Sequence, residues 1–321
     1  MTRRWAVGID FGGTNIKLGL VSPSGRVTAS AILSAKQVGR PQAFVPAAAD
    51  AVKRLAASAG LTLRQLCGIG VGAPGPVDAG RGIVHLLVNV PGWREVPLKR
   101  LLERRTGCPC AVDNDANLYA LGEWRFGAGR RAQHMVALTL GTGVGGGVIL
   151  GGELYHGVSG AAGEIGHMPL DPDGPRCGCG ARGCLEAHVG TAAIVRLARA
   201  AIRRGSPRLT RLARAAGGRI TPALVSQAAS QGDRAAREVW AAVGASLGTG
   251  IAGVINLLNP ERIVIGGGVA KAWRWFAPAM RAAVHAHAMG VPARAAAIVR
   301  AKLGDEAGIL GAAAAVCRDQ Q

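Results

Sequence analysis

The sequence predicts an α/β protein of about two domains, and three observations lead to this prediction. The chain has 321 residues, and a domain commonly runs to roughly 100–200 residues. Hydrophobic residues make up 49% of it and charged residues 18%, which suits a buried core and excludes a disordered chain. Strand-like runs alternate with helical patterns along the chain. The 49 glycines show no G-X-Y period, which excludes collagen and suggests several loops that bind ligands through the backbone.

The N-terminal part is predicted to open with three strands, over residues 5–10, 16–21 and 26–33. Tight turns join them, so we expect an antiparallel meander. A helix over 42–58, a strand over 67–71, a helix over 98–106, a strand over 110–113 and a helix over 116–126 follow. This half therefore reads as α/β with mixed strands.

The second half is predicted to begin with a strand over 135–140, a glycine loop over 141–147 and a strand over 148–150. Gly151-Gly152 then reads as a two-residue hairpin turn leading into 153–155. A cysteine-rich loop over about 167–186, an arginine-rich helical region over 191–243, a buried helix over 247–258, a strand over 262–265 and a final helix over 308–316 complete the prediction.

Two stretches, 135–152 and 239–260, carry no charge, but glycines or polar residues interrupt both. We interpret them as buried segments of a soluble protein rather than membrane spans. The first residues show no long apolar run, so no signal peptide is expected.

The chain is strongly basic, with 38 lysines and arginines against 19 acidic residues and a net charge of +19. Two explanations of the positive charge remain open: a bias in amino-acid composition, or an anionic partner such as polyphosphate, a nucleotide or nucleic acid. The arginines of 191–240 likewise allow two interpretations: they form a solvated helix face, or they form a secondary anion site.

Two glycine loops are candidate phosphate sites. The first joins two strands and supplies glycine N–H groups, a hydroxyl, a cation and a carboxylate that could hold Mg²⁺: Asp10, Gly12, Gly13, Thr14 and Lys17. An ordinary glycine hairpin is the alternative.

The second loop, Gly141, Thr142 and Gly143, falls within a formal G-x-G-x-x-G pattern. A dinucleotide fingerprint requires the glycines to open a helix, whereas here they lead into a strand, so we disfavour it. Two such loops facing one another could hold a triphosphate. A third loop, Gly266, Gly267 and Gly268, either borders a nucleoside or starts a helix.

The cysteine-rich loop predicts a metal site. His167, Cys177, Cys179 and Cys184 form a Cys₃His set suited to tetrahedral zinc with no open position, so the metal should be structural. Cys67, Cys108, Cys110 and Cys317 lack such an arrangement, and we interpret them as small core residues.

Asn114-Asp115 lies where a strand ends and a helix begins. A carboxylate there could act as a general base, but Asp113, Asn114 and Asp115 all also suit a helix N-cap. The residues alone leave both roles open.

Together these motifs resemble the ROK family of sugar kinases and repressors. The resemblance rests on Ile9-Asp10-Phe11-Gly12-Gly13-Thr14, Gly72-Ala73-Pro74-Gly75-Pro76, Asn114-Asp115-Ala116-Asn117, Gly141-Thr142-Gly143, the cysteine loop and Gly266-Gly267-Gly268. The resemblance implies a two-lobed, actin-like (ribonuclease H-like) α/β ATPase fold with a central cleft and a zinc loop. It implies a small lobe over 1–115 completed by a helix within 304–321, and a large lobe over 116–303. It also implies a cytoplasmic homodimer or homotetramer.

The resemblance assigns the site residues as well. The loops at 12–14 and 141–143 would hold the ATP phosphates, and the loop at 266–268 would border the adenosine. Asp115 would be the base, and His167 would contact both sugar and zinc. The other sugar contacts would be Gly75, Asn89, Asn114, Glu164 and Glu186.

The implied activity is ATP- and Mg²⁺-dependent phosphorylation of a hexose at its 6-hydroxyl, with glucose as the first expectation. N-acetylmannosamine, N-acetylglucosamine or fructose as acceptor, and polyphosphate as donor, remain alternatives. A sugar-sensing repressor is not expected, because the phosphate loop begins at residue 10 and leaves no room before it for a helix-turn-helix domain.

Overall fold

The computed structural model describes residues 5–87, 90 and 92–317. Asn89, predicted to contact a sugar, lies outside the described residues. The chain forms two compact units. The first comprises residues 1–137, 147–163 and 301–321, and the second comprises 138–146 and 164–300.

The first unit is built on a five-stranded sheet of order β3-β2-β1-β4-β8. Strands β1, β2 and β3 form the predicted antiparallel meander, and β4 and β8 add to it in parallel. Parallel strands place their carboxyl ends at one edge, so the ends of β1, β4 and β8 bring Asp10, Ala73 and Asn114 to the same edge. The strands are β1 Trp5–Phe11, β2 Asn15–Val21, β3 Val27–Ser34, β4 Leu66–Ala73 and β8 Cys110–Asn114.

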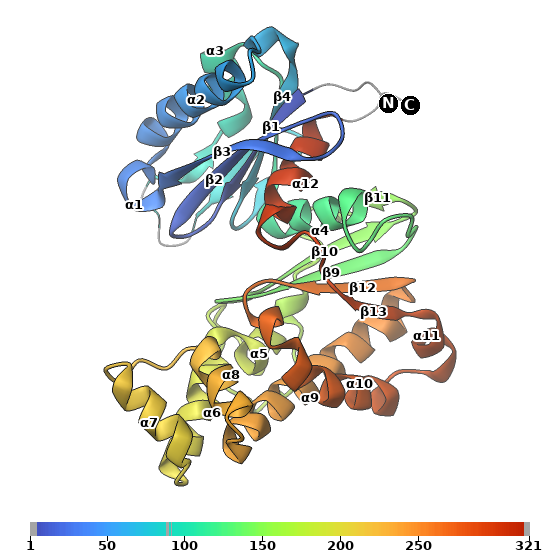
Figure 1. The fold of residues 1–321 in the computed structure, drawn as a ribbon. Coiled ribbons are helices and arrows are strands. Elements are labelled where there is room, and N and C mark those ends of the chain that lie inside the picture. Colours follow the sequence, from blue (N-terminus) through green and yellow to red (C-terminus); the bar gives the residue numbers. More distant parts are fainter. Residues whose placement is uncertain (1–4, 88–89, 91, 318–321) are drawn as a thin grey trace. The chain divides into compact units, whose positions relative to one another are not determined.

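Helices cover both faces of this sheet (Figure 1). Val7 and Ile9 of β1 pack in the cluster that contains Phe44 of α2, whereas Ala6 packs with Ile309 of α12 on the other face. Side chains alternate along a strand, so Asp10 lies on the same face as α12. The helices of this unit are α1 Ala35–Val38, α2 Pro41–Ser58, α3 Leu98–Thr106, α4 Asp115–Phe126 and α12 Ala307–Val316, with short 3₁₀ turns η1 Leu63–Gln65 and η4 Gly304–Glu306.

Glycines bring α12 into direct backbone contact with its neighbours. A Cβ on Gly70 of β4 would lie 1.7 Å from the Ala312 carbonyl oxygen, and one on Gly311 of α12 would lie 1.7 Å from that of Leu118 in α4. Only glycine permits this approach. Because α4 packs on α12 in this way, residues 116–137 group with the first unit, which differs from the boundary predicted at residue 115.

A small antiparallel sheet, β5 Val77–Asp78, β6 Ile83–Leu86 and β7 Arg94–Val96, follows β4 and was not predicted. Cys67 and Cys317, interpreted as small core residues, do pack against the buried cluster of Ala6 and Ile309, but that interpretation left out the bond between them. The two form a disulfide with their Cα atoms 5.8 Å apart, because α12 returns the distant C-terminal cysteine to β4. Cys108 and Cys110 are buried, as expected.

The second sheet has the order β11-β10-β9-β12-β13. The predicted hairpin turn is confirmed, since Leu150 pairs with Glu153 while Gly151 and Gly152 both adopt positive φ angles of 59° and 79°. Strand β10 already begins at Val144, however, so the glycine run predicted as a loop to 147 is largely strand. The strands are β9 Met135–Leu140, β10 Val144–Leu150, β11 Glu153–Leu154, β12 Arg262–Gly266 and β13 Ala297–Arg300.

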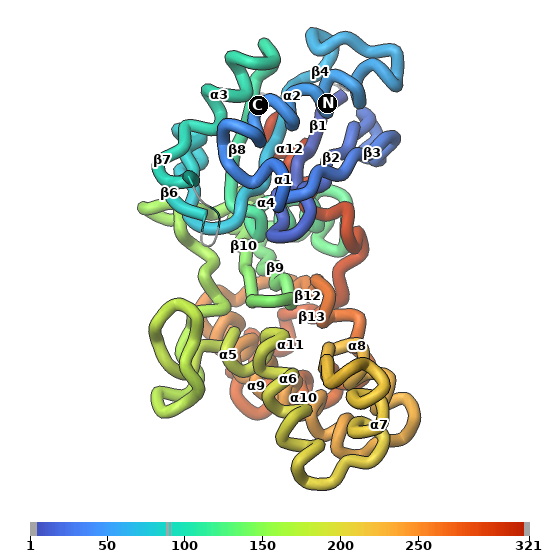
Figure 2. The backbone as a smooth tube through the Cα atoms, turned by 90° about the vertical axis from the view of Figure 1, so that its left-hand side faces the viewer, coloured from blue at the N-terminus to red at the C-terminus, as the bar shows by residue number. Residues whose placement is uncertain are grey.

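The second unit is rich in helices, which Figure 2 shows from the side. The predicted helical region is divided by turns, and its last part joins the predicted buried helix as α9. A Cβ on Gly244 or Gly248 of α9 would lie 2.2–2.3 Å from a carbonyl oxygen of α10, so these glycines allow close helix packing. The helices are α5 Leu185–Val189, α6 Thr191–Arg203, α7 Pro207–Ala215, α8 Pro222–Ser230, α9 Arg234–Leu258, α10 Trp273–His287 and α11 Gly290–Ala295, with 3₁₀ turns η2 Ile165–His167 and η3 Val269–Ala272.

Among the described residues, one helix, α9, is long and apolar enough by length and composition to cross a membrane, and 50% of its apolar window is buried inside the protein. Its buried side chains, including Val243, Leu247 and Ile251, belong to the protein core.

Candidate functional site

The first glycine loop is a tight, open turn between β1 and β2. Asp10 pairs with Lys17 across the hairpin, and the Gly12 N–H donates to the Asp10 carbonyl at 3.2 Å. A Cβ on Gly12 would come within 2.9 Å of the Asn15 carbonyl oxygen, whereas Gly13 has open space around it. Gly13 and Thr14 are exposed, so their N–H groups can be approached by an anion.

Asp10 is directed toward the first turn of α12, where a Cβ on Gly308 would lie 2.9 Å from its carboxyl carbon. Burial raises the pKa of Asp10, the nearby Lys17 cation lowers it, and the Asp305 carboxylate raises it again. Lys17 Nζ lies 3.9 Å from Asp305 Oδ2. Sequence reasoning missed Asp305, although an acidic pair just before a glycine-containing helix is a visible signal.

Asn114 performs the N-cap role for α4 that the sequence left open among three residues. Its Oδ1 accepts hydrogen bonds from the N–H groups of Ala116 and Asn117 at 2.9 and 3.2 Å. Its Nδ2 donates to the Gly75 carbonyl at 3.0 Å, so Asn114 and Gly75 are brought together. Gly75 has a φ of 84°, which favours glycine there.

Asp115 is the first residue of α4, and its Oδ1 accepts a hydrogen bond from the Ala116 N–H at 2.8 Å. Because Asn114 already caps the helix, Asp115 is not required for that purpose. The end of β8 and the start of α4 therefore present a carboxylate beside an amide that is anchored on a neighbouring loop.

The second glycine loop connects β9 to β10 in the second unit. The Gly141 carbonyl accepts hydrogen bonds from the Thr191 N–H and Oγ1 at 3.0 and 2.8 Å, which ties the loop to α6. A Cβ on Gly267 would lie 2.4 Å from the Leu140 carbonyl oxygen, so the third glycine loop passes directly beside the second. The loop leads into a strand, as expected, and not into the helix that a dinucleotide fingerprint needs.

Glu186 connects this loop to the cysteine-rich segment. Its Oε2 accepts a hydrogen bond from the Val144 N–H at 2.9 Å, and its Oε1 accepts one from the Cys177 thiol at 3.6 Å. Both contacts lie within the second unit.

The four predicted metal ligands come together in the structure. One ligand atom from each of His167, Cys177, Cys179 and Cys184 lies within 4.8 Å of all the others. Cys177 Sγ is 3.6 Å from His167 Nδ1, and Cys179 Sγ is 3.7 Å from Cys184 Sγ. Tetrahedral zinc with ordinary Zn–S and Zn–N bonds would separate its ligand atoms by about 3.6–3.8 Å, so this cluster could hold zinc.

The thiols of the cluster differ in acidity. Burial raises the pKa of Cys177 to about 12 and also raises that of Cys184, whereas a backbone hydrogen bond from Ala181 lowers the pKa of Cys179. A metal binds thiolates and must displace their protons. His167 Nε2 lies 3.8 Å from Glu164 Oε2, so the imidazole is directed to the thiols through one nitrogen and to Glu164 through the other.

Comparison with known proteins finds similar chains over nearly the whole length of this one. The ROK family model matches residues 6–319. A glucokinase from Halalkalibacterium halodurans is 38% identical over 97% of this chain and 94% of its own, and one from Thermotoga maritima is 37% identical over 97% and 96%. The crystal structure of a ROK family glucokinase from Streptomyces griseus in complex with glucose and AMPPNP superposes with a TM-score of 0.81, at 35% identity over 96% of this chain and 98% of its own.

Proposed function

Because the chain belongs to the ROK family, we propose that it is a kinase that transfers the γ-phosphoryl group of ATP to the 6-hydroxyl of glucose. The observation that carries the catalytic part of the proposal is the arrangement at the start of α4. Asn114 caps the helix and is anchored to Gly75, and the Asp115 carboxylate lies beside it at the first helical position.

In this mechanism Asp115 accepts the proton of the 6-hydroxyl as its oxygen attacks the γ-phosphorus. A bond forms between that oxygen and phosphorus while the bond to the β,γ-bridging oxygen breaks, which yields glucose 6-phosphate and ADP. The proton then passes from Asp115 to solvent.

The sugar contacts are assigned by the family resemblance, with support from local geometry. In the first unit they are Gly75 and Asn114, with Asn89 outside the described residues; in the second they are Glu164, His167 and Glu186. Carboxylates and amides suit sugar hydroxyls because they accept, or both accept and donate, hydrogen bonds.

We assign the donor phosphates to the open backbone of the glycine loops and to Lys17. The residues are Gly12, Gly13 and Thr14, then Gly141, Thr142 and Gly143, while Gly266, Gly267 and Gly268 would border the adenosine. Asp10 would hold Mg²⁺, which neutralises phosphate charge during transfer. Its carboxyl oxygens and its place beside the first glycine loop fit that ion.

Zinc on His167, Cys177, Cys179 and Cys184 would be structural, because four protein ligands leave no open position. With Nδ1 on the metal, the His167 ring would present Nε2 beside Glu164. The resemblance further implies a cytoplasmic homodimer or homotetramer.

Substrate choice is tested with one coupled assay of the purified protein. Glucose, N-acetylmannosamine, N-acetylglucosamine, fructose and mannose are each offered with ATP, and glucose is also offered with polyphosphate. We expect glucose with ATP to show the highest kcat/KM. A preference for another hexose would reassign the acceptor, and a preference for polyphosphate would reassign the donor.

The pH dependence of MgATP binding is expected to report Asp10. Only its carboxylate form can hold Mg²⁺, and burial raises its pKa. The KM for MgATP should therefore rise on acidification while the pH is still above about 4, where an ordinary aspartate titrates. Removing the Asp305 charge lowers the pKa of Asp10, so Asp305→Asn should move this rise to lower pH. A flat profile in the parent would exclude Asp10 from metal binding, whereas an unchanged profile in Asp305→Asn would show only that Asp305 does not influence the pKa of Asp10.

A further inference from the structure

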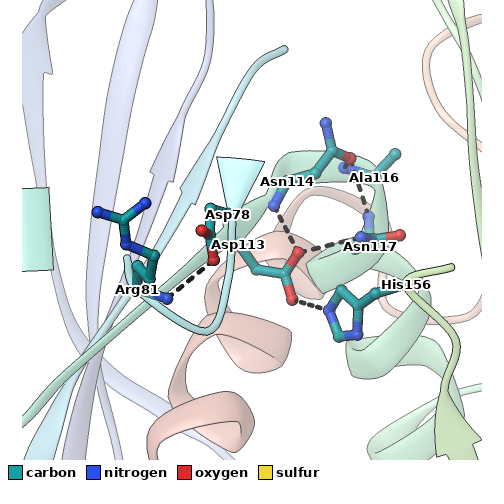
Figure 3. A network of polar contacts seen from close by, with 7 residues as sticks. All are labelled: Asp78, Arg81, Asp113, Asn114, Ala116, Asn117 and His156. Atoms are coloured by element: carbon teal, nitrogen blue, oxygen red, sulfur yellow. Dashed lines mark hydrogen bonds and ion pairs between the residues drawn. The ribbon is translucent and has the colours of Figure 1, made fainter. Parts of the chain in front are cut away.

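Asp113 carries three hydrogen bonds at the end of β8, and none of the proposed catalytic steps uses it (Figure 3). Its Oδ1 accepts from the Asn114 N–H at 2.7 Å and from Asn117 Nδ2 at 3.0 Å. Its Oδ2 lies 2.7 Å from His156 Nε2. The Asp113 side chain is only 7% exposed, so each of these bonds replaces one that water would otherwise make.

His156 reaches Asp113 from the segment just after β11, 43 residues along the chain and within the same unit. An ionised carboxylate only accepts hydrogen bonds, so the imidazole must carry its hydrogen on Nε2. Such charge-assisted bonds are stronger than neutral ones. Nothing in the sequence pattern distinguished this histidine from a surface one.

The bonds of Asp113 surround the proposed base. Asn114 immediately precedes Asp115, and Asn117 follows it by two positions. Asp113 accepts hydrogen bonds from the backbone N–H of Asn114 and from the side-chain amide of Asn117. The first turn of α4 is therefore fixed to β8 by the same carboxylate that His156 holds.

We propose that His156 and Asp113 form a positioning pair that sets the place of Asp115 for proton transfer. Neither residue needs to touch a substrate. The inference rests on the proposed role of Asp115 as base, and its reasoning is geometric: without the His156 bond, one oxygen of a buried carboxylate loses its partner, and Asp113 shifts toward another donor. The turn that carries Asp115 moves with it.

Two polar substitutions of similar size separate this role from simple packing. Glutamine places its side-chain nitrogen near the position of Nε2, whereas asparagine places it near Nδ1 and cannot reach Asp113. We expect His156→Asn to lower kcat about 10–100-fold, since a misplacement of about 1 Å can cost about 10²-fold. His156→Gln should stay within about threefold of the parent, and the sugar Kd should change little in both variants.

A matched control is His85→Asn. His85 lines the same cavity of about 680 Å³ as His156, and it also pairs with a carboxylate at 2.8 Å, but that carboxylate is Glu95 of β7 rather than Asp113. Its kcat should equal that of the parent. Equal kcat values for His156→Asn and His156→Gln, whether normal or low, would overturn the proposal.

A double variant separates this inference from the proposed function. If His156 acts through Asp115, then Asp115→Asn with His156→Asn should be no slower than Asp115→Asn alone. Multiplied losses would overturn the positioning role while Asp115 remains the base. A nearly normal kcat in Asp115→Asn would instead overturn the proposed base itself.

One measurement reads the hydrogen bond in the parent enzyme itself. Proton NMR with selective ¹⁵N-histidine labelling should show a slowly exchanging His156 Nε2 hydrogen, and the loss of that signal in His156→Gln would assign it. Rapid exchange of that hydrogen with water would overturn the proposal, because a hydrogen held by a buried carboxylate is protected.

Discussion

Replacing Asp115 with asparagine is expected to lower kcat by at least ~10²-fold, in line with general-base contributions of roughly 10²–10⁴. The amide keeps the size of the side chain and can still accept the Ala116 N–H hydrogen bond seen at 2.8 Å. It cannot take a proton from the sugar hydroxyl. Steady-state kinetics with saturating ATP and glucose measure the loss.

Sugar binding should survive this change, with a Kd by calorimetry within about tenfold of the parent value, because the lost interaction acts mainly in the transition state. Asp50→Asn is the control, since Asp50 is a half-exposed surface residue of α2 paired with Lys53. If kcat hardly moves while the sugar KM rises steeply, Asp115 is a binding residue and the base has been misassigned.

Replacing Cys179 with serine is expected to remove the metal, from about one zinc per chain to nearly none by elemental analysis, with activity falling alongside it. Cys179 is the exposed member of the cluster, whereas Cys177 and Cys184 are buried, so this substitution disturbs the core least. We expect the loss of activity because His167 would itself be a ligand of that zinc and Glu186 contacts Cys177.

Cys108→Ala provides the matched control. Cys108 is a buried thiol of the first unit that donates to the Leu63 carbonyl and lies outside the cluster. It should keep its zinc and its kcat, even where its melting temperature falls. A metal-free Cys179→Ser protein with full activity would refute the structural role of zinc.

Local signals predicted the bounds of two elements to the residue. Helix α3 at Leu98–Thr106 and strand β9 at Met135–Leu140 have the predicted bounds, because the change in hydrophobic periodicity and the flanking glycine mark their ends. Strand β10 was predicted too short, because glycine is usually a poor strand former, and here pairing within the sheet overrides that preference. The cap at Asn114 was one of three candidates, and only the backbone geometry selected it.

By itself, the sequence determined the α/β class, the meander and the grouping of His167 with three cysteines. These depend on residues close together in the chain: His167 and the three cysteines fall within one loop whose glycines permit tight turns. Only the tertiary structure decided the Cys67–Cys317 disulfide, the approach of Asp305 to Lys17 and the bond from His156 to Asp113. Each of these joins residues from separate elements, and their meeting depends on how α12 and the segment after β11 pack, which no local pattern encodes.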